Sequence, residues 1–338
     1  MAQAYYSSDA QESERSGSRL RRLGVRLRED RGYWRRGIVL AVLAVLLGLV
    51  MLLHAQIPNT IGNLGSLTET FLPWFGLFVP VLLILGLVRR SATAVIAVLV
   101  PVIAWFNLFG GLLLSDKQSG GGDLTVATHN VNADNPDPTR TARDVAASGA
   151  QVLALEELTA EDVPVYEKAL AATYPFHSVQ GTVGLWSKYP LSATRPVDIK
   201  LGWTRAMRST VATPQGDIAV YVAHMPSVRV KLDSGFTASQ RDESADALGA
   251  AIAHEQLGKV VLLGDLNGTM NDRALNAVTS QMRSTQGAAG SGFGFSWPAS
   301  FPMARIDQIM VRDIEPVSSW SLPATGSDHL PIAARVKL

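Results

Sequence analysis

The hydrophobic positions divide the chain into two parts of different character. Three long apolar runs occupy the first third, at Gly37–His54, Phe71–Val88 and Ala92–Leu114. A helix of about 20 apolar residues crosses the roughly 30 Å hydrocarbon core of a bilayer, and each run is close to this length. Buried helices of a soluble domain are the alternative, but three uncharged runs in succession are typical of membrane proteins. We therefore expect three transmembrane helices between residues 37 and 114.

The distribution of arginine predicts how these helices are oriented. Residues 1–36 hold nine Arg against five Asp and Glu, without an apolar face, which is typical of a disordered tail. The loop 55–70 contains no Lys or Arg, whereas Arg89 and Arg90 lie between the second and third runs. Because loops rich in Lys and Arg stay in the cytoplasm, we expect a multi-pass protein of the cell membrane with a cytoplasmic N-terminus. Everything after Leu114 is then extracytoplasmic.

A Gly/Ser-rich linker, residues 115–123, leads into a region of different periodicity. From Leu124 onward, short runs rich in β-branched residues alternate with amphipathic stretches, which predicts an α/β domain over residues 124–338. The expected strands are Leu124–Thr128, Val152–Leu155, Thr182–Ser187, Ser209–Thr213, Ile218–Ala223, Lys259–Leu263, Ile306–Arg312 and Ile332–Val336. The expected helices are Pro138–Ser148, Ala160–Ala172 and Ser239–His254. The Gly-rich stretch Ser284–Ser296 is expected to be a loop.

Charge and cysteine content exclude several functions. From Gly121 onward there are 18 Lys and Arg against 22 Asp and Glu, a net charge of −4. Nucleic-acid binding depends on neutralising phosphates with basic side chains, so no specific nucleic-acid partner is expected. The chain has no cysteine, which excludes disulfides, thiol catalysis and cysteine-ligated zinc.

The most informative strand end is Gly264-Asp265-Leu266-Asn267. Side chains at positions i and i+2 of a strand point the same way, so Asp265 and Asn267 are expected to face one spot. A carboxylate and a carboxamide there can orient a water molecule and hold an anionic oxygen. A turn stabilised by these side chains at the end of the strand is the structural alternative.

Other strand ends carry polar side chains of the same kind. These are Asn130, Glu157, His224, Asp307 and the pair Asp328 and His329. Each has a structural alternative, such as a turn residue, a buried histidine, or a carboxylate favoured by a helix dipole. Together they form an acid-rich set without a thiol. Such oxygen ligands suit Mg²⁺, the expected cofactor, or Mn²⁺ or Ca²⁺, better than zinc, and these cations support phosphoryl chemistry.

The order of these motifs, N…E…H…GD-x-N…D…SDH, resembles the endonuclease/exonuclease/phosphatase superfamily, which includes DNase I. The resemblance extends from Leu124 to Leu338 and includes every motif of the family in order. It implies a metal-dependent hydrolase of phosphate esters or pyrophosphates. It also implies a four-layer α/β/β/α sandwich, in which two mixed sheets pack face to face with helices outside.

The resemblance assigns roles to individual residues. The positions that correspond to metal ligands are Asn130, Glu157 and Asp328, with Glu156 in a supporting position. The positions that correspond to catalytic groups are His224, Asp265, Asn267, Asp307 and His329. Among these, Asp265 would activate or orient the attacking water, and Asp307 would orient His329.

Two arginines are candidates for binding the substrate. Arg208 and Arg241 are expected to contact phosphate because of their positions in the chain. Ion pairs that stabilise the fold are the alternative for both.

Three apolar runs followed by an external hydrolase domain resemble the VanJ/teicoplanin-resistance membrane proteins of actinobacteria, a branch of the same superfamily. This likeness implies hydrolysis of a lipid-linked phosphate or pyrophosphate at the outer leaflet, such as the undecaprenyl pyrophosphate of cell-wall synthesis. It also implies a role in resistance to teicoplanin-type glycopeptide antibiotics. The alternatives are a membrane-anchored extracellular nuclease, a phospholipid phosphodiesterase, and a binding module without activity.

Overall fold

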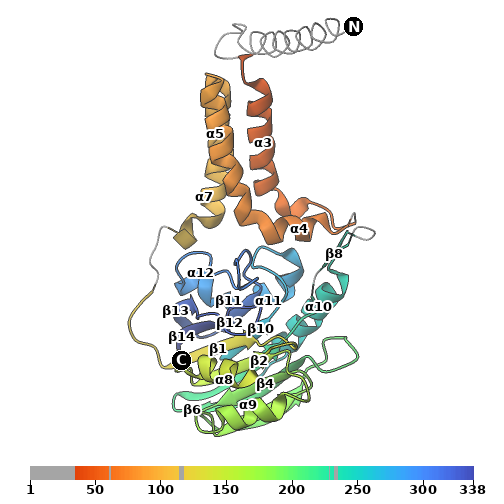
Figure 1. Cartoon of the computed structure of the whole chain (residues 1–338), viewed down its shortest axis with the longest axis vertical. Helices are drawn as coiled ribbons and strands as arrows, with labels where there is room; N and C mark the ends of the chain where they lie inside the picture. The colour runs from red at the N-terminus through yellow and green to blue at the C-terminus, as the bar shows by residue number, and fades with distance from the viewer. Residues whose placement is uncertain (1–34, 61, 114–117, 228, 232–234) are drawn as a thin grey trace, which may run out of the picture. The chain divides into compact units, whose positions relative to one another are not determined.

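The computed structural model describes residues 35–60, 62–113, 118–227, 229–231 and 235–338 (Figure 1). The expected Arg-rich tail, apart from its last two residues, and the start of the expected linker lie outside the described residues. Backbone contacts group the chain into two compact units. One unit comprises residues 1–49 and 76–103, and the other comprises residues 50–75 and 104–338.

Apolar helices dominate the first unit and continue into the flanking residues. Their bounds are α3 Ile38–Leu52, α5 Phe78–Val88, α6 Ala92–Ala97 and α7 Leu99–Leu113. Two helical stretches, Leu64–Val88 and Ala92–Leu113, are long and apolar enough to cross a membrane, with 25 and 22 residues. By contrast, α3 has only 15 residues. Two of the three expected spans therefore have suitable helices, and the third span and the orientation stay predictions.

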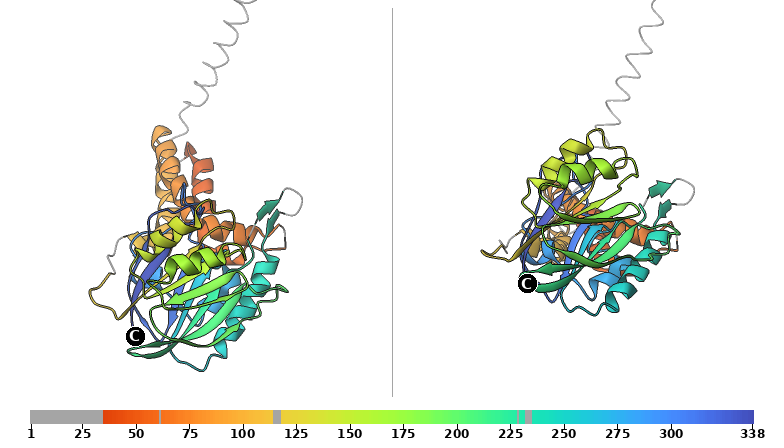
Figure 2. Two further views of the ribbon diagram at one scale, coloured as in Figure 1. Left: turned by 60° about the horizontal axis from the view of Figure 1, so that its bottom comes forward. Right: turned by 90° about the horizontal axis from the view of Figure 1, so that it is seen from below.

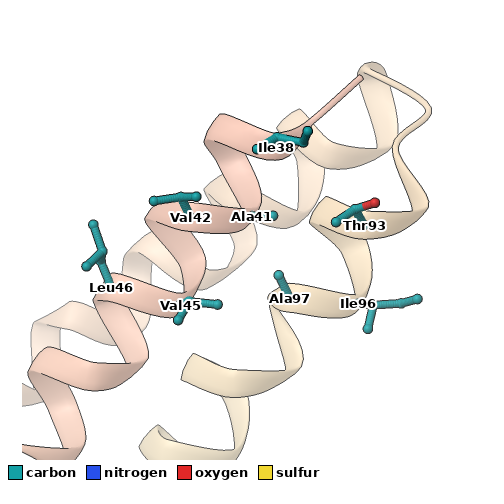
Figure 3. Close-up of a pocket in the computed structure, with 8 residues that line it drawn as sticks. All are labelled: Ile38, Ala41, Val42, Val45, Leu46, Thr93, Ile96 and Ala97. Carbon is teal, nitrogen blue, oxygen red and sulfur yellow. The ribbon is translucent and has the colours of Figure 1, made fainter. Parts of the chain in front are cut away.

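The surface of these helices is itself apolar. Large side chains such as Val39 and Val88 are more than 70% exposed. An open groove of about 500 Å³ runs between α3 and α6, and seven of its eight lining residues are apolar, with Thr93 the exception (Figure 3). Exposed apolar surface of this extent is unfavourable in water, which is consistent with a lipid environment.

The second unit contains two six-stranded sheets (Figure 1). The first has the order β13-β14-β1-β2-β4-β3, and the second has the order β11-β12-β10-β7-β6-β5. The strands of the first sheet are β1 Leu124–Asn130, β2 Val152–Glu156, β3 Phe176–Gln180, β4 Val183–Ser187, β13 Glu315–Ser321 and β14 Ile332–Lys337. The strands of the second are β5 Leu191–Pro196, β6 Ala206–Thr213, β7 Gly216–Ala223, β10 Val260–Asp265, β11 Arg283–Ser284 and β12 Asp307–Arg312. Both sheets are mixed, because β1 pairs with β2 and β7 with β10 in parallel while the other pairs are antiparallel.

Shorter elements and helices complete this unit. The helices are α4 Leu64–Phe71, α8 Pro138–Ala146, α9 Val163–Leu170, α10 Ser239–Ala253, α11 Asn276–Thr279 and α12 Thr285–Ala289. Single-turn or 3₁₀ segments are His54–Gln56, Leu72–Leu77 and Arg273–Leu275, and β8 Arg229–Lys231 pairs with β9 Gly235–Thr237. The start of α8 is encoded locally, since Asp137 accepts a hydrogen bond from the Arg140 amide at 2.9 Å and proline occupies the first turn.

Three buried clusters show that the domain has four layers. One cluster lies between the sheets and contains Val126 of β1 and Leu263 of β10. A second joins β1 and β2 to α8 and α9, and includes Ala127, the neighbour of Val126. A third joins β7 and β10 to α10. Because successive side chains of a strand point to opposite faces, both faces of each sheet are covered, as Figure 2 also shows. The expected two-sheet α/β fold is confirmed.

The sequence did not predict every element. The strands β3, β5 and β13 were missed, and all three are edge strands of mixed polarity. The short strands β8, β9 and β11 were missed as well. The loop expected at Ser284–Ser296 is wrong in part, because α12 lies within it. Ser284 caps this short helix by accepting a hydrogen bond from the Gly287 amide.

Residues that flank the apolar helices pack onto the α/β domain. In α4, Glu69 is fully buried, and its Oε1 lies 3.1 Å from Arg273 Nε. The Arg273 amide donates to Glu69 Oε2 at 3.2 Å. Aromatic rings add a second contact, since Phe293 and Phe295 stack 4.9 Å apart and Trp74 stacks on Phe295 at 5.8 Å. The α/β domain is therefore joined tightly to the segments that precede it.

Candidate active site

The first part of the site lies at the ends of β1 and β2. These neighbouring strands are parallel, with Asn130 opposite Glu156, so their last side chains reach the same edge. Glu157 follows β2 with a φ of 61°, a left-handed conformation that is uncommon for a residue with a long side chain. Its Oε2 accepts a hydrogen bond from the Ala133 amide at 3.1 Å. This local conformation takes Glu157 out of the strand and into the site.

The second part of the site lies at the edge of the other sheet. Asp265 ends β10 and is directly opposite Asp307, the first residue of the antiparallel strand β12. Gly264 has a φ of 141°, and a Cβ there would overlap the carbonyl oxygen of Ala223 in β7. Glycine is therefore required at this position, because it lets β7 and β10 come close together.

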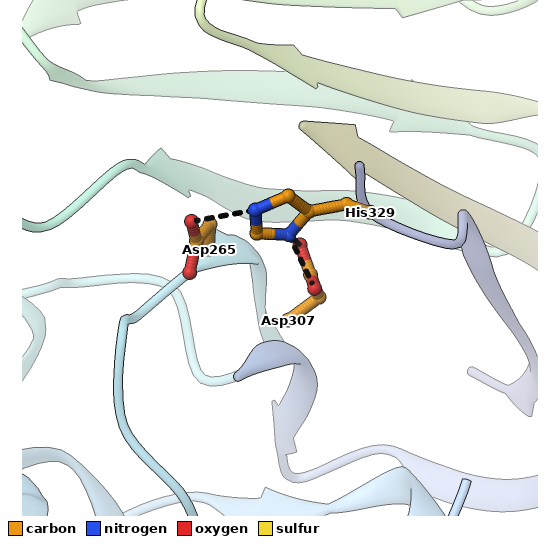
Figure 4. Close-up of side chains that lie close together, drawn as sticks. All are labelled: Asp265, Asp307 and His329. Carbon is orange, nitrogen blue, oxygen red and sulfur yellow. Dashed lines mark hydrogen bonds and ion pairs between the residues drawn. The ribbon is translucent and has the colours of Figure 1, made fainter. Parts of the chain in front are cut away.

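His329 connects the two aspartates (Figure 4). Its Nδ1 lies 2.9 Å from Asp307 Oδ2, and its Nε2 lies 3.9 Å from Asp265 Oδ2. The loop that carries His329 is fixed to the first sheet, since Ser327 Oγ donates to the Asn130 carbonyl at 2.7 Å. The His329 amide in turn donates to Ser327 Oγ at 3.0 Å. The two sheets are thus joined at the site by a buried hydrogen-bonded loop.

Asp265 is the most densely hydrogen-bonded group in the site. Asn130 Nδ2 donates to its Oδ2 at 3.1 Å, and Asn267 Nδ2 donates to the same oxygen at 3.1 Å. The Asn267 amide donates to its Oδ1 at 2.8 Å. Asn267 also donates to the Met225 carbonyl at 3.0 Å. The expected pairing of Asp265 with Asn267 is therefore present, and Asn130 joins it from the other sheet.

His224 lies between the acidic side chains. Its Nε2 is 3.5 Å from Glu157 Oε1 and 3.8 Å from Asp265 Oδ2. Arg205 Nη2 also contacts the His224 ring, at both of its nitrogens. The guanidinium of Arg205 also lies over the ring of Trp203, 5.1 Å from its centroid. A cation thus borders the site where the anionic side chains converge.

The sequence did not single out Arg205, although a signal for it exists. The turn at residues 214–216 sets the register of the β6–β7 hairpin, in which Ala206 is opposite Ala223. Arg205 therefore lies next to His224, and its carbonyl accepts a hydrogen bond from the His224 amide at 2.8 Å. Counting back from the turn would have placed Arg205 beside a predicted catalytic residue.

The protonation states follow from burial and charge. Burial raises the pKa of Asp265 to about 7, with the Asp307 carboxylate adding to the effect and the His329 imidazolium opposing it. Burial alone would lower the pKa of His329, but the carboxylates of Asp307 and Asp265 raise it to about 10. Burial opposes ionisation of Asp307, yet the neighbouring His329 lowers its pKa. His329 and Asp307 are therefore an ion pair at neutral pH.

His224 differs from His329 because a cation, Arg205, contacts its ring and disfavours its protonation. Burial lowers the pKa of His224 well below its ordinary value, and the positive charges of Arg205 and His329 lower it further. His224 is therefore a neutral imidazole. The two histidines of the site have different charges and can take different chemical roles.

The donor set fits a divalent cation. Among the described residues, Asp265, Asp307 and His329 have ligand atoms that all lie within 4.8 Å of one another. Because His329 is protonated and bound to Asp307, it is a poor ligand in this state. Oxygen atoms of Glu157 and Asn130 are better suited, and such oxygens favour Mg²⁺ over zinc. The side chain of Glu157 is also 31% exposed, and so is open to an ion from solvent.

The remaining predicted residues lie elsewhere. Asp328 is exposed, and its Oδ2 accepts a hydrogen bond from Trp297 Nε1 at 3.4 Å. Glu156 is buried beside the site, where Thr128 Oγ1 donates to its Oε1 at 2.6 Å. Burial raises the pKa of Glu156 well above its ordinary value, so it is a neutral acid. This placement agrees with a supporting position for Glu156, whereas a metal-binding role for Asp328 stays a prediction.

The two arginines predicted to bind phosphate are buried in other ion pairs. Arg208 forms a two-point ion pair with Glu255, at 2.8 and 2.9 Å. Arg241 Nη1 lies 2.7 Å from Asp272 Oδ2 and donates to the Asn267 carbonyl at 2.8 Å. The structure does not bring Arg208 to the candidate active site. Arg241 contacts a residue of this site only through the backbone carbonyl of Asn267.

Residues 127–329 match the endonuclease/exonuclease/phosphatase family, and the chain belongs to this family. Its members are phosphoesterase hydrolases that are generally metal-dependent. The expected membership of the superfamily is therefore confirmed. No curated protein matches the chain, and the expected likeness to the teicoplanin-resistance proteins stays a prediction.

Solved structures with the same fold support this placement. An endonuclease/exonuclease/phosphatase from Beutenbergia cavernae is 18% identical, with a TM-score of 0.51 over 64% of this chain and 72% of that one. A humanized D. rerio TDP2 is 17% identical, with a TM-score of 0.54 over 64% and 99% of the two chains. The mannosyl-6-phosphatase Bt3783 of Bacteroides thetaiotaomicron is 15% identical, with a TM-score of 0.52 over 64% and 100%. At these identities the likeness shows the fold alone.

Proposed function

We propose that this protein is a membrane-anchored, metal-dependent phosphohydrolase that acts outside the cytoplasm on a lipid-linked phosphate or pyrophosphate. The observation that carries the proposal is the buried Asp265, which meets two amides, a neutral imidazole and an imidazolium at the junction of the two sheets. Support for a lipid substrate comes from the apolar helices and from their flanking segments, which pack onto the α/β domain.

Asp265 would act as the general base. A carboxylate with a pKa of about 7 accepts a proton more readily than an ordinary one while remaining partly ionised at neutral pH. Its oxygens are fixed by Asn130 and Asn267, so a water molecule beside it would be oriented toward a bound phosphorus atom. The water oxygen would bond to phosphorus, its proton would pass to Asp265, and the bond to the leaving oxygen would break.

The positive groups of the site would stabilise the charge that develops on the phosphoryl oxygens. His329 is held as an imidazolium by Asp307, and Arg205, which contacts the His224 ring, supplies a second cation. Preorganised charges of this kind stabilise the transition state more than the ground state. His224 is neutral and could donate a hydrogen bond to a phosphoryl oxygen.

Glu157 and Asn130 would hold the divalent cation, expected to be Mg²⁺, and Asp265 would stay free to accept the proton. When bound, the cation supplies further positive charge to the phosphate oxygens. The acidic side chains of the site would otherwise repel an anionic substrate, which gives a physical reason for metal dependence.

The test is phosphate release from undecaprenyl pyrophosphate by the full-length protein in neutral detergent. We expect release with Mg²⁺, no release with a chelator, and no release by Asp265→Asn. The matched control is Asp144→Asn, which removes an exposed carboxylate from α8. If the folded, metal-loaded protein releases no phosphate, undecaprenyl pyrophosphate is not its substrate. Degradation of plasmid DNA by the same preparation would favour the nuclease alternative.

The role in antibiotic resistance is tested separately in cells. Expression of the active protein is expected to raise the tolerated concentration of teicoplanin, because lipid-carrier turnover and glycopeptide action meet in cell-wall synthesis. Asp265→Asn, expressed at the same level, should give no such increase. Equal protection by both proteins would show that hydrolysis is not the cause.

A further inference from the structure

The segment 267–273 follows β10 and connects the candidate active site to α4. It begins at Asn267, whose backbone amide donates to Asp265 Oδ1 at 2.8 Å and whose Nδ2 donates to Asp265 Oδ2 at 3.1 Å. It ends at Arg273, which forms an ion pair with Glu69 of α4. The conformation of this segment therefore determines where the carboxamide of Asn267 lies relative to the proposed general base.

The backbone of Asn267 needs support from its surroundings. Its φ is 46°, a left-handed conformation that residues with a Cβ seldom adopt. Such a conformation persists only where surrounding contacts fix it. The amide and the side chain of Asn267 are bound to Asp265 and to the Met225 carbonyl. The carbonyl oxygen of Asn267 is the remaining polar group, and a contact there fixes the segment from its other side.

Arg241 of α10 makes this contact. Its Nη1 donates to the Asn267 carbonyl at 2.8 Å, and the same nitrogen lies 2.7 Å from Asp272 Oδ2. Its Nε and Nη2 both donate to Asp242 Oδ1, at 3.1 and 2.8 Å. A guanidinium bound by two carboxylates keeps one orientation, because its donors form a rigid fork. Arg241 therefore ties the start of the segment to Asp272 near its end.

The far part of the segment is held by α4. Thr269 Oγ1 donates to the Glu69 carbonyl at 3.3 Å, and the Arg273 amide donates to Glu69 Oε2 at 3.2 Å. Arg273 Nε donates to Glu69 Oε1 at 3.1 Å, and Arg273 Nη2 donates to the His54 carbonyl at 3.0 Å. Glu69 is fully buried, so these bonds do not compete with water. The segment is thus held from two sides, by α10 through Arg241 and by α4 through Glu69.

We propose that Arg241 and Glu69 are positioning residues, which hold the segment 267–273 so that Asn267 keeps its contacts with Asp265. Because its side chain is only 1% exposed, Arg241 acts through Asn267 and not by touching a phosphate group. The effect on catalysis rests on the hydrolytic activity proposed above, whereas the effect on the segment does not.

This arrangement makes α4 a part of the catalytic unit. The helix begins the stretch Leu64–Val88, which is long and apolar enough to cross a membrane. Glu69 extends from this stretch to the segment that carries Asn267. The geometry at Asp265 therefore depends on the attachment of α4 to the α/β domain.

Hydrogen exchange of the full-length protein in neutral detergent, read by mass spectrometry, tests whether the segment is held. We expect Arg241→Gln to speed exchange over residues 265–273 at least about ten-fold, because the hydrogen bonds that protect this segment are lost. Glu69→Gln should speed exchange over residues 269–273. Arg208→Gln is the matched control, since it also removes a buried arginine that is paired with a carboxylate, Glu255. It should leave exchange over residues 265–273 unchanged.

Steady-state kinetics with Mg²⁺ and bis(p-nitrophenyl) phosphate, a soluble phosphate ester, test the effect on catalysis. Asn267 and Asp265 would act on the attacking water, so we expect Arg241→Gln to lower kcat at least about ten-fold with little change in KM. Glu69→Gln should lower kcat at least about three-fold. Arg241→Lys should recover part of the lost kcat, because lysine can still donate to the Asn267 carbonyl. At a temperature well below its unfolding, Arg208→Gln should keep the kcat of the unmodified protein.

Three outcomes would overturn the proposal. Unchanged exchange over residues 265–273 in Arg241→Gln would show that this arginine does not hold the segment. Faster exchange with an unchanged kcat would show that the segment does not position the catalytic groups. An equal loss of kcat in Arg208→Gln would assign the effect to stability.

Two further results are distinguished by the same experiments. If Arg241→Gln does not fold, Glu69→Gln is the deciding variant, and unchanged exchange over residues 269–273 in it would overturn the proposal. If the unmodified protein cleaves neither this ester nor undecaprenyl pyrophosphate, the proposed function is wrong. Hydrogen exchange then decides by itself whether Arg241 and Glu69 hold the segment.

Discussion

Asp265 and Asp307 lie directly opposite each other on the antiparallel strands β10 and β12, and His329 bridges their carboxylates. Two buried carboxylates this close could not both be ionised without a cation between them. The imidazolium of His329 is that cation. The pair of aspartates therefore fixes the charge of the histidine, while the histidine fixes the ionisation of Asp307.

Asp307→Asn should change the pH dependence of activity. The carboxylate of Asp307 is the main cause of the raised pKa of His329, about 10, and its removal leaves burial as the dominant effect. The pKa of His329 should then fall to the ordinary 6.5 or below. We expect the alkaline limb of the kcat/KM profile to move from about pH 10 to neutral or acidic pH, with a lower maximum. Asp144→Asn is the control and should keep the original profile.

The same substitution should change the pH dependence of stability. A histidine with a raised pKa in the folded state contributes stability that is fully present below pH 6.5 and is lost as the pH rises through about 10. The melting temperature of the unmodified protein should therefore decline between pH 6.5 and 10. That of Asp307→Asn should decline less over the same range. An identical decline in both proteins would contradict the ion pair.

Arg205→Gln should weaken productive binding of the phosphate substrate. One charged hydrogen bond to a phosphate oxygen contributes about 1.5–3 kcal/mol, so we expect kcat/KM to fall by roughly ten- to a hundred-fold. Steady-state kinetics with a soluble phosphate ester measure this, and Arg195→Gln controls for the loss of one positive charge. Unchanged kcat/KM would mean that Arg205 only supports the His224 ring.

Gly264→Ala should destabilise the domain by more than backbone strain alone. A left-handed conformation costs a residue with a Cβ about 1–3 kcal/mol, and here the Cβ would also overlap Ala223 of β7. Gly216→Ala is a matched control, because Gly216 has a φ of 109° and open space around its Cβ position. Denaturant unfolding should show a larger loss for Gly264→Ala. Equal losses would indicate that β7 and β10 can separate without cost.

Glu69→Gln should loosen the attachment of α4 to the α/β domain. The buried carboxylate is bound by the Arg273 side chain and amide, and losing a charged partner typically costs about 1–3 kcal/mol. We expect a lower melting temperature and faster proteolysis near residues 269–273. Glu167→Gln, which breaks an exposed pair with His177, should have little effect. Equal stability of both variants would show that the Glu69–Arg273 pair does not hold α4 on the domain.

Much of the site could be predicted from the sequence because strand ends are local features. The apolar runs before Asn130, Glu157, His224 and Asp265 identify buried strands, and the polar residues follow where each run stops. The order of motifs then identified the family. The edge strands β3, β5 and β13 escaped prediction because no apolar run or alternation marks them. β3 and β5 have no buried residue, and the sequence of β13, EPVSSWS, is mostly polar.

The tertiary structure alone decided which charges meet. Arg208 lies opposite Tyr221 in the β6–β7 hairpin, and both side chains reach Glu255 at the end of α10. Three residues earlier, Arg205 reaches the candidate active site instead, where it contacts His224. The sequence determined that Arg208 lies on β6 and that Arg205 directly precedes this strand. Their partners are set by hairpin register and by a helix almost 50 residues away, because ion pairing depends on distances in space that local periodicity does not encode.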